Sequence, residues 1–345
     1  MDIFTIYLPI AEMEFNIILL IAIGFCVGTL GGFFGVGGAW IVTPALNIFG
    51  FRMAFAIGTD LAHIFGKSII ATKKHAGMGN VDWRLGLFSI AASVIGIEVG
   101  KRVVLALERT GNVGDVVRWV YMVFLFGLGF YMVYDYVSAM KRMRREGAEA
   151  PSAGPVEVTS PAAIKLRKIS LPPNVSLPTS GIDRISFWVI FSIFLLTGFL
   201  SGFMGVGGGF ILLPALIYLV GCPTTVAVGT SLLSVCFMAG YGCFTYSLSG
   251  RTELIAAMIM LIGAAIGAQI GVLATRYVRG YGIRLLFAIM ILLAGVSVAL
   301  KQGESLLELP VLGTLAGYFV MGAAGGMTLL IFVRLLKGII AEKSV

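Results

Sequence analysis

Long apolar stretches dominate this sequence and restrict what it can fold into. Several run near or beyond the roughly 20 residues that a helix needs to cross the hydrocarbon core of a bilayer. The clearest are Phe15 to Phe34, Leu85 to Leu107, Trp119 to Ala139, Phe187 to Phe203 and Leu285 to Leu300. Spanning segments must satisfy their backbone hydrogen bonds internally, and runs this long favour helices over barrel strands. We therefore predict an all-α polytopic membrane protein, with the lipid bilayer as its solvent.

Composition supports the same class. Of the 345 residues, 58% are hydrophobic and only 12% are charged, whereas a soluble domain carries about 25% charged residues. The net charge of +8 could indicate a nucleic-acid partner. However, the basic residues lie in short loops between apolar runs and form no continuous stripe, so we predict no nucleic-acid binding.

An internal repeat divides the chain. The segment Gly32 to Leu46 matches Gly202 to Leu216 at a shift of 170 residues. Further along, at a shift of 171, Asp82 aligns with Glu253. We predict four regions: a first transmembrane repeat at 1–138, a Pro-rich and basic cytoplasmic linker at 139–184, a second transmembrane repeat at 185–300, and an extra C-terminal transmembrane helix at 301–345. The expected number of membrane segments is about nine to eleven.

The distribution of Lys and Arg predicts the orientation. If the linker is cytoplasmic, the loops on its side hold 17 basic residues and the opposite loops hold 7. Because cytoplasmic loops carry the excess, we expect the linker and the C-terminus inside and the N-terminus outside, in the inner (plasma) membrane. The first half then enters from outside and the second from inside. Such inverted-topology repeats are the architecture of many secondary transporters.

Each half carries a glycine cluster followed by a proline. The residues concerned are Gly35, Gly37, Gly38 and Pro44 in the first half and Gly205, Gly207, Gly208 and Pro214 in the second. Glycine permits unwound backbone, proline removes a donor, and the N-terminus of a half-helix attracts anions. We predict broken or re-entrant helices that bind an anion here, and the sequence leaves open whether these pieces cross or turn back. The alternative is small-residue helix packing without a substrate.

These motifs resemble a known family, the TauE/SafE permeases. The resemblance rests on the repeated pattern Gly-x-Gly-Gly-(Gly/Ala)-x-x-x-x-Pro-x-Leu, the steps Gly58-Thr59 and Gly229-Thr230, and the loop from Gly79 to Arg84. It covers essentially the chain outside the linker and the last helix. It implies transport, usually export, of sulfur-containing oxyanions such as sulfite, sulfonates or sulfoacetate. The first copy departs from the pattern in having Ala39 where the second has Gly209.

Ionisable residues occur inside one apolar segment, where they are costly. Asp60, His63 and Lys67 fall at i, i+3 and i+7, on one helix face. Their repeat partners carry no charge and are Ser231, Ser234 and Met238. This asymmetry favours anion binding or proton relay by the first-half residues, with His63 as a proton-coupling candidate. Alternatively, Lys67 snorkels to the cytoplasmic edge and Asp60 merely pairs with His63.

Glu98 is the second proton-coupling candidate. It aligns with Gln269 and lies between Gly96 and Gly100 in the apolar segment from Leu85 to Leu107. A local ion pair with the nearby Lys101 or Arg102 is an equally good interpretation.

Together these features predict a secondary transporter of small sulfur-containing anions. The predicted substrate site combines the two glycine-proline breaks, Thr59, Thr230, Ser231, Ser234 and the face of Asp60, His63 and Lys67. No nucleotide motif or metal cluster is present, so we expect no cofactor, no metal, and coupling to an ion gradient or the membrane potential. Alternatives are a passive anion channel, or a permease for another small anion or sulfur compound. An enzyme is disfavoured because no nucleophile–base pair is evident; a homodimer is possible.

Overall fold

The computed structural model describes residues 4–36, 39–145, 161–169, 171–277 and 281–343. Among them, eight helices are long and apolar enough to cross a membrane. They are α1 (Ile17–Phe34), α3 (Met53–Gly77), α5 (Val113–Arg145), α7 (Phe187–Met204), α9 (Thr224–Leu248), α10 (Leu254–Ala274), α11 (Tyr281–Leu307) and α12 (Pro310–Lys343). The predicted all-α polytopic fold is confirmed.

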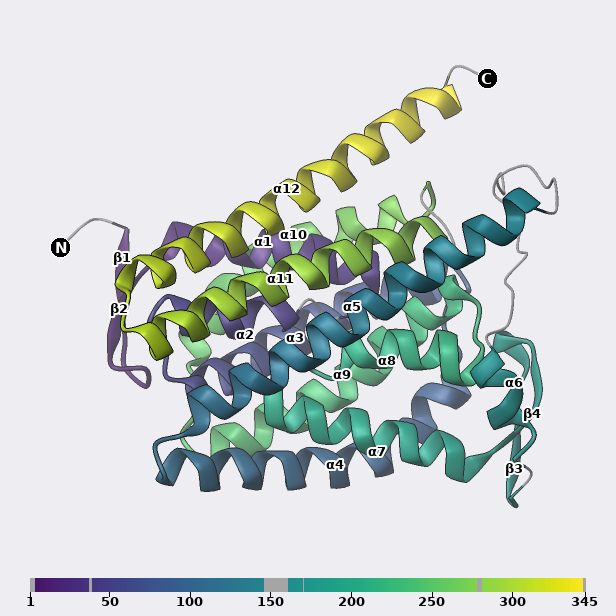
Figure 1. Ribbon diagram of the computed structural model, residues 1–345, viewed down its shortest axis with the longest axis horizontal. Helices are drawn as coiled ribbons and strands as arrows, with labels where there is room; N and C mark the ends of the chain where they lie inside the picture. Colours follow the sequence, from purple (N-terminus) through teal and green to yellow (C-terminus); the bar gives the residue numbers. More distant parts are fainter. Residues whose placement is uncertain (1–3, 37–38, 146–160, 170, 278–280, 344–345) are drawn as a thin grey trace.

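Further helices complete the bundle (Figure 1). The helix α4 (Trp83–Arg109) is also long but is not among these eight. Two short segments follow the glycine motifs, α2 (Ala39–Ile48) and α8 (Gly209–Ala215), the latter continued by η2 (Leu216–Val220). Among the described residues, the eight spans and α4 make nine long helices, and α2 and α8 raise the number to eleven. The prediction was nine to eleven segments.

Two short hairpins, which the apolar pattern did not predict, open the two halves. One pairs β1 (Thr5–Leu8) with β2 (Met13–Asn16), and the other pairs β3 (Asn174–Leu177) with β4 (Ile182–Ser186). Asn16 and Ser186 then cap α1 and α7 through their side-chain oxygens. The hairpins lie at opposite ends of the molecule, so α1 and α7 run in opposite directions (Figure 1).

The predicted linker is partly structured. The helix α5 continues to Arg145, so the first residues of the 139–184 region are helical. The rest includes α6 (Pro161–Arg167), η1 (Pro178–Ser180) and the second hairpin. On the other side of the chain, α11 extends past the predicted boundary at residue 300 as far as Leu307.

Glycine rows hold the two halves together. A Cβ added to Gly24, Gly28 or Gly32 of α1 would overlap the backbone of α10. In the same way, a Cβ on Gly198 or Gly202 of α7 would overlap the backbone of α4. Small residues at four-residue spacing let helices approach closely where no hydrophobic force drives them together. Each of these helix pairs joins one half of the chain to the other.

Candidate functional site

Both helix breaks occur at the glycines predicted for them. The helix α1 ends at Gly35 with φ of 73°, and α7 ends at Gly205 with φ of 77°. Gly207 and Gly208 also have positive φ, at 59° and 73°. Glycine adopts this left-handed conformation at little cost, whereas other residues resist it. The predicted residues Gly37 and Gly38 lie outside the described part of the chain.

After each break the chain turns back. In the first half, Phe15 before α1 makes ring contacts with Phe49 and Phe51, which follow α2. In the second half, Arg167 of α6, beside the β3–β4 hairpin, donates to the carbonyl of Val220 at the end of η2. We call the segment after each break an arm: α2 in the first half, and α8 with η2 in the second. Each arm therefore returns to the end of the molecule at which its half begins. Pro44 and Pro214 lie inside these arms.

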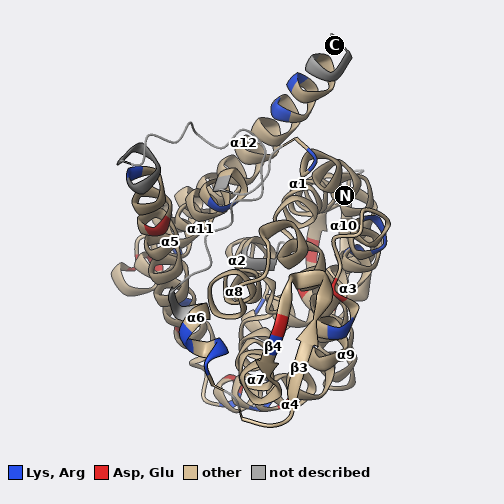
Figure 2. Cartoon of the chain, turned by 90° about the vertical axis from the view of Figure 1, so that its right-hand side faces the viewer, with Lys and Arg blue, Asp and Glu red and all other residues tan. Residues whose placement is uncertain are grey.

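The two arms meet in the middle of the bundle. A Cβ at Gly209, the first residue of α8, would overlap the carbonyl of Val36 in the opposite break. Viewed from one end of the molecule, α2 and α8 lie side by side, enclosed by the longer helices (Figure 2). The close approach explains why the second motif has glycine at position 209.

The predicted charged face of α3 points into this centre. The side chains of Asp60 and His63 are fully buried, and Lys67 is 2% exposed. The Nζ of Lys67 lies 3.5 Å from Nδ1 of His63, which in turn lies 3.6 Å from Oδ1 of Asp60. The three groups thus form a continuous row. Because the Lys67 head group is buried beside His63, it does not snorkel to the cytoplasmic edge as the alternative interpretation required.

Asp60 connects this row to the first arm. Its Oδ2 accepts hydrogen bonds from the backbone N–H of Thr43, at 3.0 Å, and from the Thr43 hydroxyl, at 2.8 Å. A Cβ at Gly205 would lie 2.9 Å from the same hydroxyl oxygen. Asp60 therefore lies at the junction of α3, the first arm and the second break.

The corresponding face of α9 contacts the breaks from the other side. The Ser231 hydroxyl donates to the carbonyl of Gly35, at the first break. Met238 packs against Gly208, and a Cβ added to that glycine would lie 2.8 Å from the Met238 sulfur. Ser234, between them on the helix, is fully buried. The repeat-equivalent residues of α3 and α9 thus face the same central region, one set charged and the other uncharged.

Several polar atoms in this region lack a hydrogen-bond partner. Among the described residues, Asp60 Oδ1, His63 Nε2 and Ser234 Oγ are buried without a hydrogen bond. Leaving such a group unsatisfied costs about 1–3 kcal/mol, so each case calls for an explanation. A polar or charged ligand that binds between α3 and α9 would supply these hydrogen bonds.

The Gly-Thr steps have a structural task. The Thr230 hydroxyl accepts the backbone N–H of Asp82, and the Thr59 hydroxyl accepts that of Glu253, each at 2.9 Å. Because Asp82 and Glu253 are repeat partners, these are equivalent contacts made twice between the halves. The assignment of both threonines to the substrate site remains a prediction, but their hydroxyls already bind the turns before α4 and α10.

Glu98 forms the local ion pair that was the alternative to a proton-coupling role. Its Oε1 lies 2.9 Å from Nε of Arg102, and the two side chains are 30% and 74% exposed. Its coupling role remains a prediction without geometric support.

Sequence reasoning missed Thr43, although a signal was present. Thr43 precedes Pro44 in the first motif, whereas the aligned residue of the second motif is Leu213. This is the same contrast between a polar and an apolar residue that identified Asp60.

Beside Pro44 lies a small hollow of about 10 Å³, large enough for about one water molecule. Its lining includes Tyr121 and two cationic residues, Arg118 and Lys301.

No metal centre accompanies these groups in the described part of the chain, where no three His, Cys, Asp or Glu residues gather as ligands.

Comparisons with known proteins agree with this architecture. The family described as Sulfite exporter TauE/SafE matches residues 20–298. A relative named "Probable membrane transporter protein YunE", from Bacillus subtilis, is 24% identical over 81% of this chain and 96% of its own length. A "Probable membrane transporter protein" of Xylella fastidiosa is 28% identical over 74% of this chain and 82% of its own length. No solved structure matches the chain.

Proposed function

The chain belongs to the sulfite exporter TauE/SafE family, and on that basis we propose that this multi-pass membrane transporter exports small sulfur-containing oxyanions. Sulfite, sulfonates and sulfoacetate are the proposed cargo class. The observation that carries the proposal is the buried row of Asp60, His63 and Lys67 between two helix breaks, with polar atoms left unpartnered. We propose no catalytic activity.

In this proposal Lys67 provides the positive charge that replaces part of the hydration shell of the anion. Gly205, Gly207 and Gly208 carry no side chain of their own, so the anion approaches their backbone closely once the side chains packed against them, such as Met238, move aside. His63, between the carboxylate of Asp60 and the ammonium of Lys67, exchanges a proton as the anion enters or leaves. Coupling to a proton gradient or to the membrane potential then follows from a change of charge at one site.

Alternating access is proposed to arise from inverted-topology repeats. Two observations support this: α1 and α7 run in opposite directions (Figure 1), and the contacts of Thr59 and Thr230 recur between the halves. In such transporters the substrate binds at the repeat interface, and one repeat moves against the other. In this proposal the central region between α3 and α9 is the substrate site.

We propose that the linker and the C-terminus are cytoplasmic, because the loops on that side hold 17 of the basic residues. On a background without the four native cysteines, L171C in the linker should be shielded from an impermeant thiol reagent in intact cells. E12C, in the first hairpin at the other end, should be labelled. The reverse pattern would contradict the orientation in the inner membrane.

The function is tested by flux through proteoliposomes loaded with sulfite. We expect sulfite to move against its own gradient when a proton gradient or a potential is imposed, with competition by sulfonates and sulfoacetate and little by monocarboxylates. Flux only down the sulfite gradient would identify a passive anion channel. Preference for a different anion would retain the transporter and reject the proposed cargo.

A further inference from the structure

The helix α12 stands apart from the transport module. It lies outside the family match, which ends at residue 298, and has no partner in the repeat. It packs along α11, α1 and α10, and its C-terminal part extends away from the bundle (Figure 1). A helix added to the outside of a complete module needs its own physical explanation.

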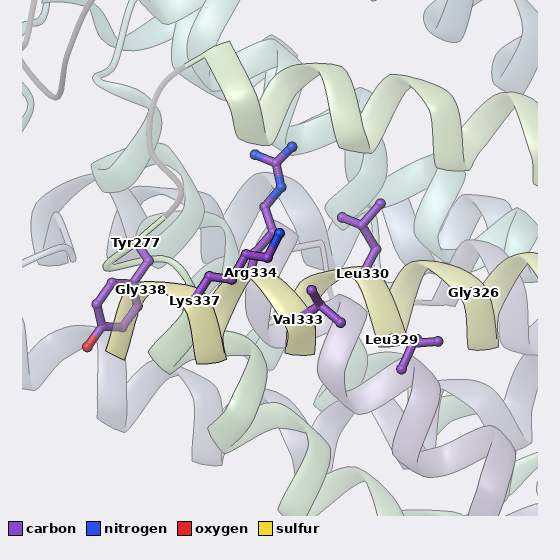
Figure 3. Close-up of a pocket in the computed structure, with 8 residues that line it drawn as sticks. All are labelled: Tyr277, Gly326, Leu329, Leu330, Val333, Arg334, Lys337 and Gly338. Carbon is purple, nitrogen blue, oxygen red and sulfur yellow. The ribbon is translucent and has the colours of Figure 1, made fainter. Parts of the chain in front are cut away.

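A groove of about 800 Å³ follows the C-terminal part of α12. One portion is apolar and another is basic (Figure 3). The residues that line it are Tyr277, Gly326, Leu329, Leu330, Val333, Arg334, Lys337 and Gly338. Tyr277 follows α10 and forms the end of the groove. Its ring packs on Gly338 so closely that a Cβ there would overlap it.

Among the side chains that the structure describes, none supplies a countercharge to the basic portion. Arg334 and Lys337 lie three residues apart on α12, are both exposed, and are directed to the same side of the helix as Leu330 (Figure 3). Within the described ranges, neither makes an ion pair or a hydrogen bond. Two adjacent cations beside an aromatic ring suit a phosphate group.

The dimensions of the groove fit one lipid leaflet. From Arg334 to Gly326 the helix rises roughly 12 Å, at 1.5 Å per residue. Half of the hydrocarbon core is about 15 Å thick. Leu330 and Leu329, both exposed, lie along this length toward the middle of α12. A phosphate at the cations would therefore place an acyl chain along the apolar portion.

We propose that this groove binds an anionic phospholipid, with its phosphate on Arg334 and Lys337 and an acyl chain along Leu330 and Leu329. Basic pockets between transmembrane helices bind anionic headgroups in the same way. The bound lipid occupies the groove along α12, which Tyr277 closes at one end by its contact with Gly338. The site is separate from the row on α3 and does not depend on the proposed substrate.

The test uses native mass spectrometry of the full-length protein, delipidated and then mixed with equal amounts of phosphatidylglycerol and phosphatidylcholine. The wild-type protein should retain phosphatidylglycerol preferentially. R334Q/K337Q should lose that preference by about ten- to thirty-fold, the effect of two cations near an anionic headgroup. The matched control is K73Q/R84Q, which removes two exposed cations at the α3–α4 turn and should retain the preference.

Four outcomes would overturn the proposal. One is equal phosphatidylglycerol retention by wild type and R334Q/K337Q, and another is equal loss in the control. The third is a wild-type dimer that R334Q/K337Q dissociates, which would assign the groove to a second copy of the chain. Displacement of the lipid by sn-glycerol 3-phosphate at the same concentration would also reject it, because the site would then recognise a soluble anion.

Discussion

Replacing Gly207 by leucine is expected to abolish transport while the protein still inserts into the membrane. Gly207 has φ of 59°, and a Cβ there would lie 3.1 Å from Val235 and 3.2 Å from Ile64. Leucine would therefore be strained by about 1–2 kcal/mol in its backbone and would push α3 and α9 apart at the break. Sulfite flux in proteoliposomes measures the effect, and size-exclusion chromatography of the purified variant checks its folding.

Gly127→Leu is the matched control. Gly127 lies in α5, is exposed, and has no atom within 4 Å of an added Cβ. The same chemical change there should leave transport at the wild-type level. Gly207→Ala adds only the Cβ and serves as the test if the Leu variant does not fold. We expect it to retain partial flux. Full activity in both Gly207 variants would show that the break only packs the helices and binds no substrate.

The buried row on α3 could be predicted because it depends on a contrast within the sequence. Aligning the halves shows charge at Asp60, His63 and Lys67 where the second half has none, and helical spacing places these three residues on one face. The glycine clusters likewise predict broken backbone from conformational preference alone. Both predictions rest on local properties that a single alignment provides.

Contacts between distant segments were not predictable in this way. Helical periodicity shows which face of a helix is buried, but not which helix covers it. The hydrogen bond from the N–H of Glu253 to the Thr59 hydroxyl, across 194 positions of the chain, is one contact that the sequence did not predict. Thr43 was missed because its importance comes from contact with Asp60 on another helix. The hairpins were missed because strands of four or five residues carry too little pattern.

Lys67→Met is expected to weaken the affinity for sulfite by about ten- to a hundred-fold. Hydrogen bonds to charged groups contribute roughly 1.5–3 kcal/mol, and each 1.4 kcal/mol is about a factor of ten in affinity. Methionine occupies the equivalent position in the second half, Met238, and suits buried apolar surroundings. Because removing the ammonium leaves the buried Asp60 carboxylate without its countercharge, the thermal stability of the variant should fall, and the measurement therefore requires variant protein that is shown to be folded. Calorimetric titration of the folded protein measures the affinity.

Lys74→Met is the control, because it removes one positive charge from the same helix away from the row. Its Nζ donates to the carbonyl of Gln269 on α10, so the affinity for sulfite should stay at the wild-type value. Loss of affinity in Lys67→Met alone would support direct contact between this ammonium and the anion. Equal loss in both variants would indicate a general effect of net charge. Unchanged affinity in Lys67→Met would remove Lys67 from the site, because a buried charge that contacts the anion cannot be deleted without weakening its binding.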